Sequence, residues 1–524
     1  MALSLLRNTL VQSGMTLLSR MLGFLRDILL AARIGAGPVG DAWTTALMFP
    51  NLFRRIFAEG AFASAFVPSY SRALEADGKE AAEKIASEAL RVLFAMTAAI
   101  TILAQIAMPW VLLLVHGGQA DDTENFNLAI LLTRITMPYL TCMSIAALLS
   151  GVLNSGGRFF LSAAVPTILN LCLIASAFVS VSPTITAQAA AIATLIAGVL
   201  QALLLAWGVR RQNVNLSLIG MPRITPGVKK VMALAIPGTI AASGTQINII
   251  VSQSLASFEV GAKTWLYYAD RLYQLPLGIV GVAIGVAILP RLSRAARSED
   301  SATSRKTMDE GIGLAMALTL PAAIALFVAP GFLIEGIFVR GAFQSDDAAY
   351  SGLALMNYAW GVPAFVLIKV LAPAYFAHED TRTPMAFALW SVLINTLLGA
   401  GLFFFLRQDS GLGFPGLAIA TSTAAWVNVI LLFGGIMRRG WYSPGPLLIS
   451  RLMRALFAAI LMGVAVWFAV RHADVIRGYV LDSKILTTLV VITGGAMVYG
   501  ISAILTGAIR PQDIKGLVRR RSVE

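Results

Sequence analysis

The stretch MPYLTCMSIAALLSGVLNSGGRFFLSAAVPTILN, residues 137–170, returns in outline as VPAFVLIKVLAPAYFAHEDTRTPMAFALWSVLIN, residues 362–395, 225 residues further along the chain. A shorter pair, AFVPSYSRA at 65–73 and AILPRLSRA at 287–295, lies 222 residues apart. The nearly equal offsets indicate an internal duplication whose second copy begins near residue 228. The duplication predicts two equivalent lobes.

Composition places both copies in a membrane. Of the 524 residues, 57% are hydrophobic and 13% are charged, whereas soluble domains average about 25% charged residues. Apolar runs of the roughly 20 residues that cross a bilayer recur from end to end. We therefore expect an all-α polytopic membrane protein with about fourteen transmembrane helices. Their predicted limits are 8–32, 39–71, 92–115, 125–153, 159–181, 184–208, 231–258, 264–290, 310–337, 346–376, 384–406, 414–437, 455–470 and 485–508.

These spans divide into a first lobe of six at 1–225, a second lobe of six at 226–440, and a two-helix addition with a basic tail at 441–524. Six spans separate equivalent positions, so both lobes cross the membrane in the same direction. Two parallel lobes are typical of transporters that rock about a substrate site at the lobe interface. A channel could share the repeat, but it has no evident need for lobes of such different charge.

Basic residues predict the orientation. With a cytoplasmic N-terminus, the inside loops and tails collect 26 of the 40 Lys and Arg residues, and the outside loops hold 7. That asymmetry favours both termini in the cytoplasm. It also accounts for most of the net charge of +13, for which anionic lipid of the cytoplasmic leaflet is a sufficient partner. No nucleic-acid partner is expected.

The other seven basic residues fall inside predicted spans, and five of them lie in the first, second and eighth. An arginine at the centre of a lipid-facing helix costs about 3 kcal/mol, so we expect these three helices to face a water-filled cavity. In SRMLGFLRD, residues 19–27, Arg20 and Asp27 lie on one helix face, and Arg26 lies about 120° round from Arg20. The seven are Arg20, Arg26, Arg54, Arg55, Arg134, Arg271 and Lys369.

The acids in these spans have arginines within reach, which favours an anionic cargo over a cation. Guanidinium groups suit phosphate and carboxylate oxygens. Asp41, at the start of the second span, is a candidate for a salt bridge at the outer mouth. The pairs are Asp27 with Arg26, Glu59 with Arg55, and Asp270 with Arg271.

Some of these intramembrane basic residues could instead have roles that do not involve a substrate. Arg54 and Arg55 could snorkel to lipid head groups, and so, less readily because they lie deeper, could Arg20 and Arg26. Arg134 and Lys369 are equally compatible with structural pairing or snorkelling. The remaining chemistry-bearing residues indicate neither an enzyme nor a metal site, because no HExxH, P-loop or GxSxG motif is present. Free cysteines in apolar runs behave as small hydrophobes, and the histidines stand alone near span ends; these residues are Cys142, Cys172, His116, His378 and His472.

Three blocks together resemble the MurJ (MviN) lipid II flippase family of the multidrug/oligosaccharidyl-lipid/polysaccharide (MOP) exporter superfamily. They are SRMLGFLRD at 19–27, GDAWTTALMFPNLFRRIFAEGAFASAFVP at 40–68 and YYADRLYQLPLGIVGVAIG at 267–285. The resemblance runs over nearly the whole chain. It implies a MATE-like fold of two six-helix lobes in the bacterial inner membrane, with two C-terminal helices that form an apolar groove for a polyprenyl tail.

The resemblance also implies the activity: translocation of lipid II, the undecaprenyl-pyrophosphate-linked peptidoglycan precursor, to the periplasmic leaflet by alternating access. Its implied partners are lipid II, membrane lipids and the peptidoglycan-synthesis machinery. The family's outer-gate aspartate falls on Asp41, and its gate and cavity acids fall on Asp27 and Glu59, with Asp270 as a further candidate acid. The family's substrate-binding arginines fall on Arg20, Arg26, Arg54, Arg55 and Arg271.

At two positions this chain differs in charge from some members of the family. Met48 and Gln274 stand where some family members have a lysine and a glutamate. Some relatives bind sodium through acids in the seventh and eleventh spans, but this chain offers only amides there, which argues against a sodium site and leaves no cofactor expected. The amides are Gln246, Asn248 and Asn395. Movement of an anionic head group predicts dependence on membrane potential.

The sequence leaves other functions open. A related exporter of another lipid-linked saccharide, or a drug/ion antiporter, is the first alternative. A non-transporting scaffold for cell-wall enzymes is the second. A pyrophosphate hydrolase is the weakest, because the chain has no acid cluster that would bind a metal.

Overall fold

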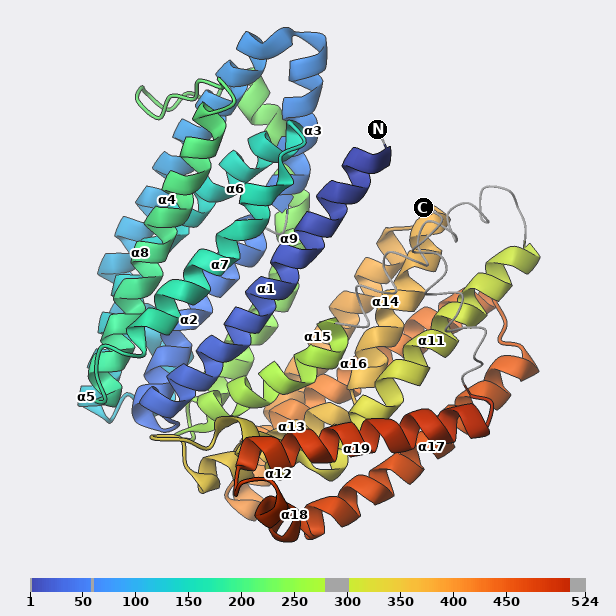
Figure 1. The fold of residues 1–524 in the computed structure, drawn as a ribbon. Helices are drawn as coiled ribbons and strands as arrows, with labels where there is room; N and C mark the ends of the chain where they lie inside the picture. Colours follow the sequence, from blue (N-terminus) through green and yellow to red (C-terminus); the bar gives the residue numbers. More distant parts are fainter. Residues whose placement is uncertain (1, 58–60, 279–300, 509–524) are drawn as a thin grey trace. The chain divides into compact units, whose positions relative to one another are not determined.

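The computed structural model describes residues 2–57, 61–278 and 301–508, and α-helices make up nearly all of them (Figure 1). Within these residues the one β-bridge joins Arg340 and Phe343. The chain divides into two compact units, Met1–Thr264 with Arg340–Gln344, and Trp265–Val339 with Ser345–Glu524.

The first unit contains nine α-helices and a short 3₁₀ helix among the described residues. They are α1 (Ala2–Ile34), α2 (Pro38–Phe57), α3 (Ala61–Ala76), α4 (Gly78–His116), η1 (Gly117–Gln119), α5 (Thr123–Thr136), α6 (Tyr139–Ser155), α7 (Phe159–Ser176), α8 (Pro183–Arg210) and α9 (Pro226–Ala256). Helix α9 packs on α3 and α4, and so it belongs to the first unit by its contacts. The lobe boundary at residue 225 stays a prediction.

The second unit holds most of the helix at 262–278, whose first residues belong to the first unit. Its other described helices are α11 (Ser301–Val328), α12 (Pro330–Phe338), α13 (Ser345–Ala359), α14 (Val362–Ala377), α15 (Arg382–Ser410), α16 (Phe414–Arg438), α17 (Pro446–Arg471), α18 (Ala473–Tyr479) and α19 (Lys484–Leu505).

Each copy of the longer repeat forms a pair of helices joined by a short turn. The first copy gives α6 and α7, and the second gives α14 and α15. In the shorter repeat, 65–73 lies in α3, whereas 287–295 lies outside the described residues.

Ten helical segments among the described residues are long and apolar enough to cross a membrane. They include α5 with α6, and α13 with α14, each pair counted as one segment. The predicted spans without such a segment are the first, second, seventh and eighth, three of which carry the arginine candidates. The multi-pass membrane architecture is confirmed, and the exact count of fourteen stays a prediction.

The last two long helices pack within the second unit. Helix α17 lies along α11, and α19 contacts both α12 and α17. Glycines permit this close approach: a Cβ on Gly463 would meet Ile324 at 2.6 Å, and a Cβ on Gly495 would meet Val466 at 2.8 Å. The Tyr499 hydroxyl donates to the carbonyl of Ala317. Their outer faces expose large apolar side chains suited to lipid contact, among them Phe457, Trp467, Met497 and Ile501.

A polar contact joins two turns of the second unit. The Arg439 guanidinium, just after α16, pairs with Asp380 in the turn between α14 and α15. Thr383 also donates its backbone N–H to Asp380, over 3.0 Å. Hydrogen bonds from Thr383 and Arg439 hold the pKa of the Asp380 carboxyl well below its usual range. The ionised carboxylate thus fixes the start of α15.

Candidate functional site

Two side chains hold Arg26, which lies eight residues before the end of α1. Its Nε and Nη2 donate to Asp27 Oδ1 over 3.0 and 2.7 Å, and its Nη1 donates to Asn170 Oδ1 on α7 over 3.0 Å. The side chains of Arg26 and Asp27 are only 12% and 5% exposed. The guanidinium therefore has a fixed orientation inside an otherwise apolar packing of α1 on α7.

Sequence reasoning missed Asn170. Its Nδ2 donates to the backbone oxygen of Ser19 over 2.8 Å, and a Cβ on Gly23 would lie 3.4 Å from the same nitrogen. The small residue lets the amide reach α1. The internal repeat could have pointed to Asn170, because Asn170 is the last residue of the first copy of the long repeat and Asn395 is the last residue of the second. Both side chains are buried.

The other substrate-binding arginine candidates of the first unit are Arg20, Arg54 and Arg55. Arg20 is exposed on α1. Arg54 and Arg55 fall within α2, but their side chains lie outside the described residues, as does Glu59. The expected pairing of Arg55 with Glu59 therefore stays a prediction.

The eighth predicted span places its candidates in the second unit. Arg271 Nη2 donates to the Tyr267 hydroxyl over 2.9 Å, and its guanidinium carbon lies 4.6 Å from the centre of that ring. The Asp270 carboxylate accepts a hydrogen bond from the Gln274 amide one turn later. Gln274, a departure from some family members, thus supplies a donor where a glutamate would repel Asp270.

Asp41 lies at the centre of a buried polar cluster in the first unit. Its side chain is fully buried. Oδ2 accepts from Gln119 Nε2 over 2.8 Å and from the Gly261 N–H over 2.7 Å. Oδ1 accepts from the Thr264 N–H over 3.1 Å and from its hydroxyl over 2.8 Å. The carboxylate therefore caps the N-terminus of the helix at 262–278, where a negative charge is stabilised.

The salt bridge expected at Asp41 is not among these contacts, because neutral donors fill both carboxylate oxygens. The nearby cation, Lys263, contacts other groups. Its Nζ donates to Thr45 Oγ1 over 2.8 Å and to the carbonyl of Val115 over 2.6 Å. It also lies 2.8 Å from His116 Nδ1. Lys263, which lies between the predicted spans 231–258 and 264–290 and was therefore counted among the outside-loop residues, is fully buried.

His116 was expected to stand alone and instead shares this cluster. An ammonium group has only donors, so the Lys263 ammonium donates to His116 Nδ1. The contact joins residues 147 positions apart, and neither residue stands in a motif. Asn125 Nδ2 in α5 donates to Gln119 Oε1 over 2.6 Å, which extends the cluster around Asp41 to α5.

Replacing Lys263 with methionine is expected to lower the free energy of unfolding by about 2–3 kcal/mol, because the Val115 carbonyl and His116 Nδ1 lose a buried donor. Adding His116→Phe removes one of those orphaned acceptors. The double variant should therefore be more stable than the sum of the two single changes predicts, by about 1 kcal/mol or more. Thermal unfolding of the four purified proteins measures this coupling, and strictly additive shifts would contradict the contact.

The two remaining charges lie in different environments. Arg134 Nε donates to the carbonyl of Gln105 over 3.0 Å, and Gln105 Nε2 returns a bond to the carbonyl of Arg134 over 2.8 Å. This exchange ties α4 to α5 and supports structural pairing for Arg134. Lys369 is exposed on α14. Among the residues that the structure describes, no group of three or more His, Cys, Asp or Glu side chains could hold a metal ion.

Comparison with known sequences gives a consistent match. A family model described as lipid II flippase MurJ matches residues 30–481. A Rhizobium tropici protein named "Probable lipid II flippase MurJ" is 39% identical over 528 residues, covering 99% of this chain and 96% of the relative. The Burkholderia cenocepacia "Lipid II flippase MurJ" is 36% identical over 475 residues, covering 89% and 91%.

Solved structures confirm the exporter fold. A structure titled "Lipid II flippase MurJ, inward closed conformation" superposes with a TM-score of 0.77 at 24% identity, covering 95% of this chain and 98% of that one. An inward-facing multidrug resistance MATE family transporter of the MOP superfamily gives a TM-score of 0.66 at 16% identity, covering 82% and 98%. These likenesses concern the fold alone.

Proposed function

The chain belongs to the lipid II flippase MurJ family, and from that premise we propose that it carries lipid II from the cytoplasmic to the periplasmic leaflet by alternating access. The observation that carries the proposal is Arg26, a guanidinium held inside the apolar packing of α1 and α7 by Asp27 and Asn170. A buried cation kept in a fixed orientation is suited to an anionic head group.

The head group of lipid II carries a pyrophosphate and peptide carboxylates. We propose Arg26 in the first unit and Arg271 in the second as phosphate-binding residues, because their planar forks match phosphate oxygens. Arg20, Arg54 and Arg55 are the further candidates for binding the head group. Asp27 and Asn170 act as positioning residues for Arg26. The polyprenyl tail stays in lipid or along α17 and α19, whose exposed faces are apolar.

Asp41 belongs to the gating step in this proposal. Three of its four hydrogen bonds, from the Gly261 N–H and from the N–H and hydroxyl of Thr264, fix that segment to α2. Release of these bonds would let the helix at 262–278 move during alternating access. Asp27, Glu59 and Asp270 balance the cavity arginines.

The chain is a multi-pass inner-membrane protein of the family. We place both termini in the cytoplasm, because the inside loops would then carry most of the basic residues. The peptidoglycan-synthesis machinery is the partner class that would supply and consume lipid II.

The test is lipid II accessibility at the outer face of cells depleted of this protein and complemented at matched membrane levels. Wild type should restore outward lipid II, whereas Arg26→Ala and Arg271→Ala should lower it at least tenfold. Purified variants with unchanged thermal stability exclude a folding defect. Normal outward lipid II in both variants would overturn the assignment and move exporters of other cargo to first place.

The same cells test the energy source. Moving one charge across 100 mV is worth about 2.3 kcal/mol, so an inside-negative potential would expel the anionic head group and draw cavity cations inward. Collapse of the potential should therefore slow flipping, and an unchanged rate would remove this coupling.

A further inference from the structure

The exposed apolar side of α4 fixes the level of the membrane surface on the first unit. Large apolar side chains are exposed from Phe94 to Leu114, and no charge lies between Arg91 and His116. At about 1.5 Å per residue this stretch is about 30 Å long, which matches the hydrocarbon core. Arg91 therefore lies about 5 Å beyond the apolar boundary, at the level of lipid head groups.

Helix α8 gives the same boundary independently. Trp207 in its last turns is half exposed, and the Arg211 guanidinium lies 5.1 Å from the centre of the indole ring. Tryptophan and arginine together are typical of a membrane interface. The connection from α8 to α9, residues 211–225, begins at this level.

The connection is tied to α4 at the head-group level. Arg91 Nε donates to the carbonyl of Ser217 over 3.0 Å, and the Ser217 N–H donates to Ser87 Oγ over 3.2 Å. Gly220 has φ +135°, and a Cβ there would lie 2.8 Å from the Arg91 guanidinium carbon. The positive φ favours glycine at this position. The segment therefore stays beside the interface.

Large apolar side chains of this segment are exposed on the protein surface. Ile219 is 90% exposed and Met221 is 79% exposed, and Leu218 and Ile224 are also exposed. Soluble surfaces rarely gather apolar groups so densely. At the membrane surface the same groups can enter the boundary between head groups and acyl chains.

A small basic cavity adjoins these side chains. It has a volume of about 300 Å³ and is lined by Glu88, Arg91, Met221 and Arg223. The Glu88 carboxylate already accepts the Thr225 hydroxyl over 2.7 Å. Two guanidinium groups therefore face one carboxylate, which leaves the cavity positive and suited to a phosphate.

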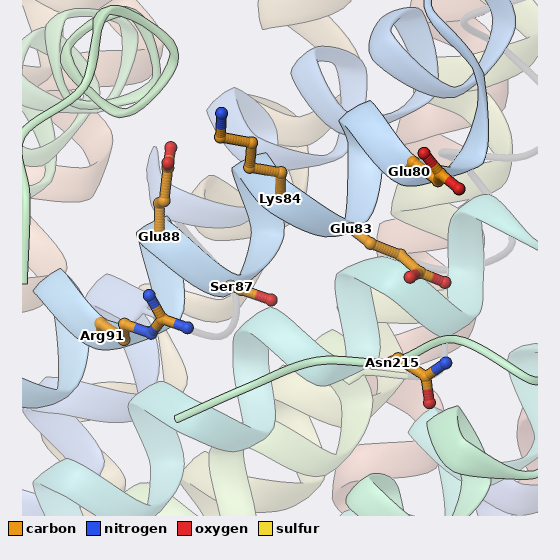
Figure 2. Close-up of a pocket in the computed structure, with 7 residues that line it drawn as sticks. All are labelled: Glu80, Glu83, Lys84, Ser87, Glu88, Arg91 and Asn215. Atoms are coloured by element: carbon orange, nitrogen blue, oxygen red, sulfur yellow. The ribbon is translucent and has the colours of Figure 1, made fainter. Parts of the chain in front are cut away.

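The neighbouring cavity differs in charge. Figure 2 shows it along the start of α4, with the segment that carries Asn215 passing beside it. It has a volume of about 350 Å³, and its lining has three glutamates, Glu80, Glu83 and Glu88, against two cations, Lys84 and Arg91. Acids outnumber bases there, so the basic cavity at Arg223 is the better phosphate site.

We propose that residues 217–224, SLIGMPRI, form a membrane anchor that binds anionic phospholipid of the surrounding bilayer. Ile219 and Met221 enter the interface, and Arg91 and Arg223 bind the head-group phosphate. The bilayer is the occupant because the segment lies at head-group depth and its paired cations complement anionic lipid. The anchor holds the α8–α9 connection to one leaflet and is independent of the transported substrate.

An environment-sensitive fluorophore on Met221→Cys, in a Cys142→Ala/Cys172→Ala background, tests the anchor. The labelled protein is reconstituted in vesicles of phosphatidylcholine alone or with equimolar phosphatidylglycerol. With phosphatidylglycerol we expect blue-shifted emission and quenching by nitroxide lipids labelled at the head group. A label on Lys79→Cys, about 22 Å beyond Phe94 along α4, should remain water-exposed in both.

Matched charge removals separate recognition from general attraction. Arg223→Gln should lower the phosphatidylglycerol-dependent quenching several-fold, whereas Lys84→Gln, which removes the same charge from α4, should leave it unchanged. Emission typical of water in both vesicle types would overturn the anchor. Equal quenching in both lipids, or equal effects of the two charge removals, would overturn the binding of anionic lipid by Arg223.

Discussion

Replacing Asp41 with alanine is expected to lower the free energy of unfolding by about 3–5 kcal/mol, because four buried donors lose their acceptor at once. These donors are Gln119 Nε2, the N–H groups of Gly261 and Thr264, and the Thr264 hydroxyl. Thermal unfolding of the purified protein, with denaturant midpoints as a second readout, measures the loss.

The conservative change Asp41→Asn should lower the free energy of unfolding by almost as much. In Asp41→Asn, one of the two acceptor oxygens becomes an NH₂ group, which places a donor against the other donors around it. Thr264→Val is the matched control, since it removes one hydroxyl and leaves the backbone N–H, for an expected cost of about 1 kcal/mol. An Asp41→Asn protein as stable as wild type would contradict the capping role.

Arg26→Lys is expected to lose at least tenfold in outward lipid II, close to the loss in Arg26→Ala, although the charge is kept. The guanidinium uses three nitrogens at once, two on Asp27 and one on Asn170. An ammonium group is a single point on a flexible stem and cannot hold this geometry. Outward lipid II in complemented cells, together with stability of the purified variant, measures the effect.

Arg134→Lys provides the comparison. Arg134 lies in α5 and donates one bond, from Nε, to the carbonyl of Gln105, which a lysine can also satisfy. Outward lipid II should then stay near the wild-type level. If Arg26→Lys transported as well as Arg134→Lys, a positive charge at position 26 would be sufficient for transport. The orientation of Arg26 by Asp27 and Asn170 would then not be required.

The family and fold followed from local features of the sequence. The thickness of the hydrocarbon core sets the length of each apolar run, and the cost of burying charge restricts intramembrane arginines to useful places. Thus the polytopic all-α class and the pairing of Arg26 with Asp27 could be predicted from adjacent residues, and the duplication from similar stretches 225 positions apart. Gln274 beside Asp270 also follows from spacing within one helix.

Contacts between distant segments needed the tertiary structure. Asn170 reaches α1 across 144 positions, and Lys263 reaches His116 across 147. The short stretch around Lys263 reads as an exposed loop because lysine prefers water. The fold buries it instead, because Asp41 binds the flanking Gly261 and Thr264.

The sequence by itself determined the membrane class, the duplicated architecture and the candidate arginines, because hydrocarbon thickness and charge burial act on each segment separately. Only the tertiary structure decided which neutral donors surround Asp41, where Lys263 lies and which amide orients Arg26. These contacts depend on which helices pack together, and the sequence pattern of a single helix does not indicate which helices are its neighbours.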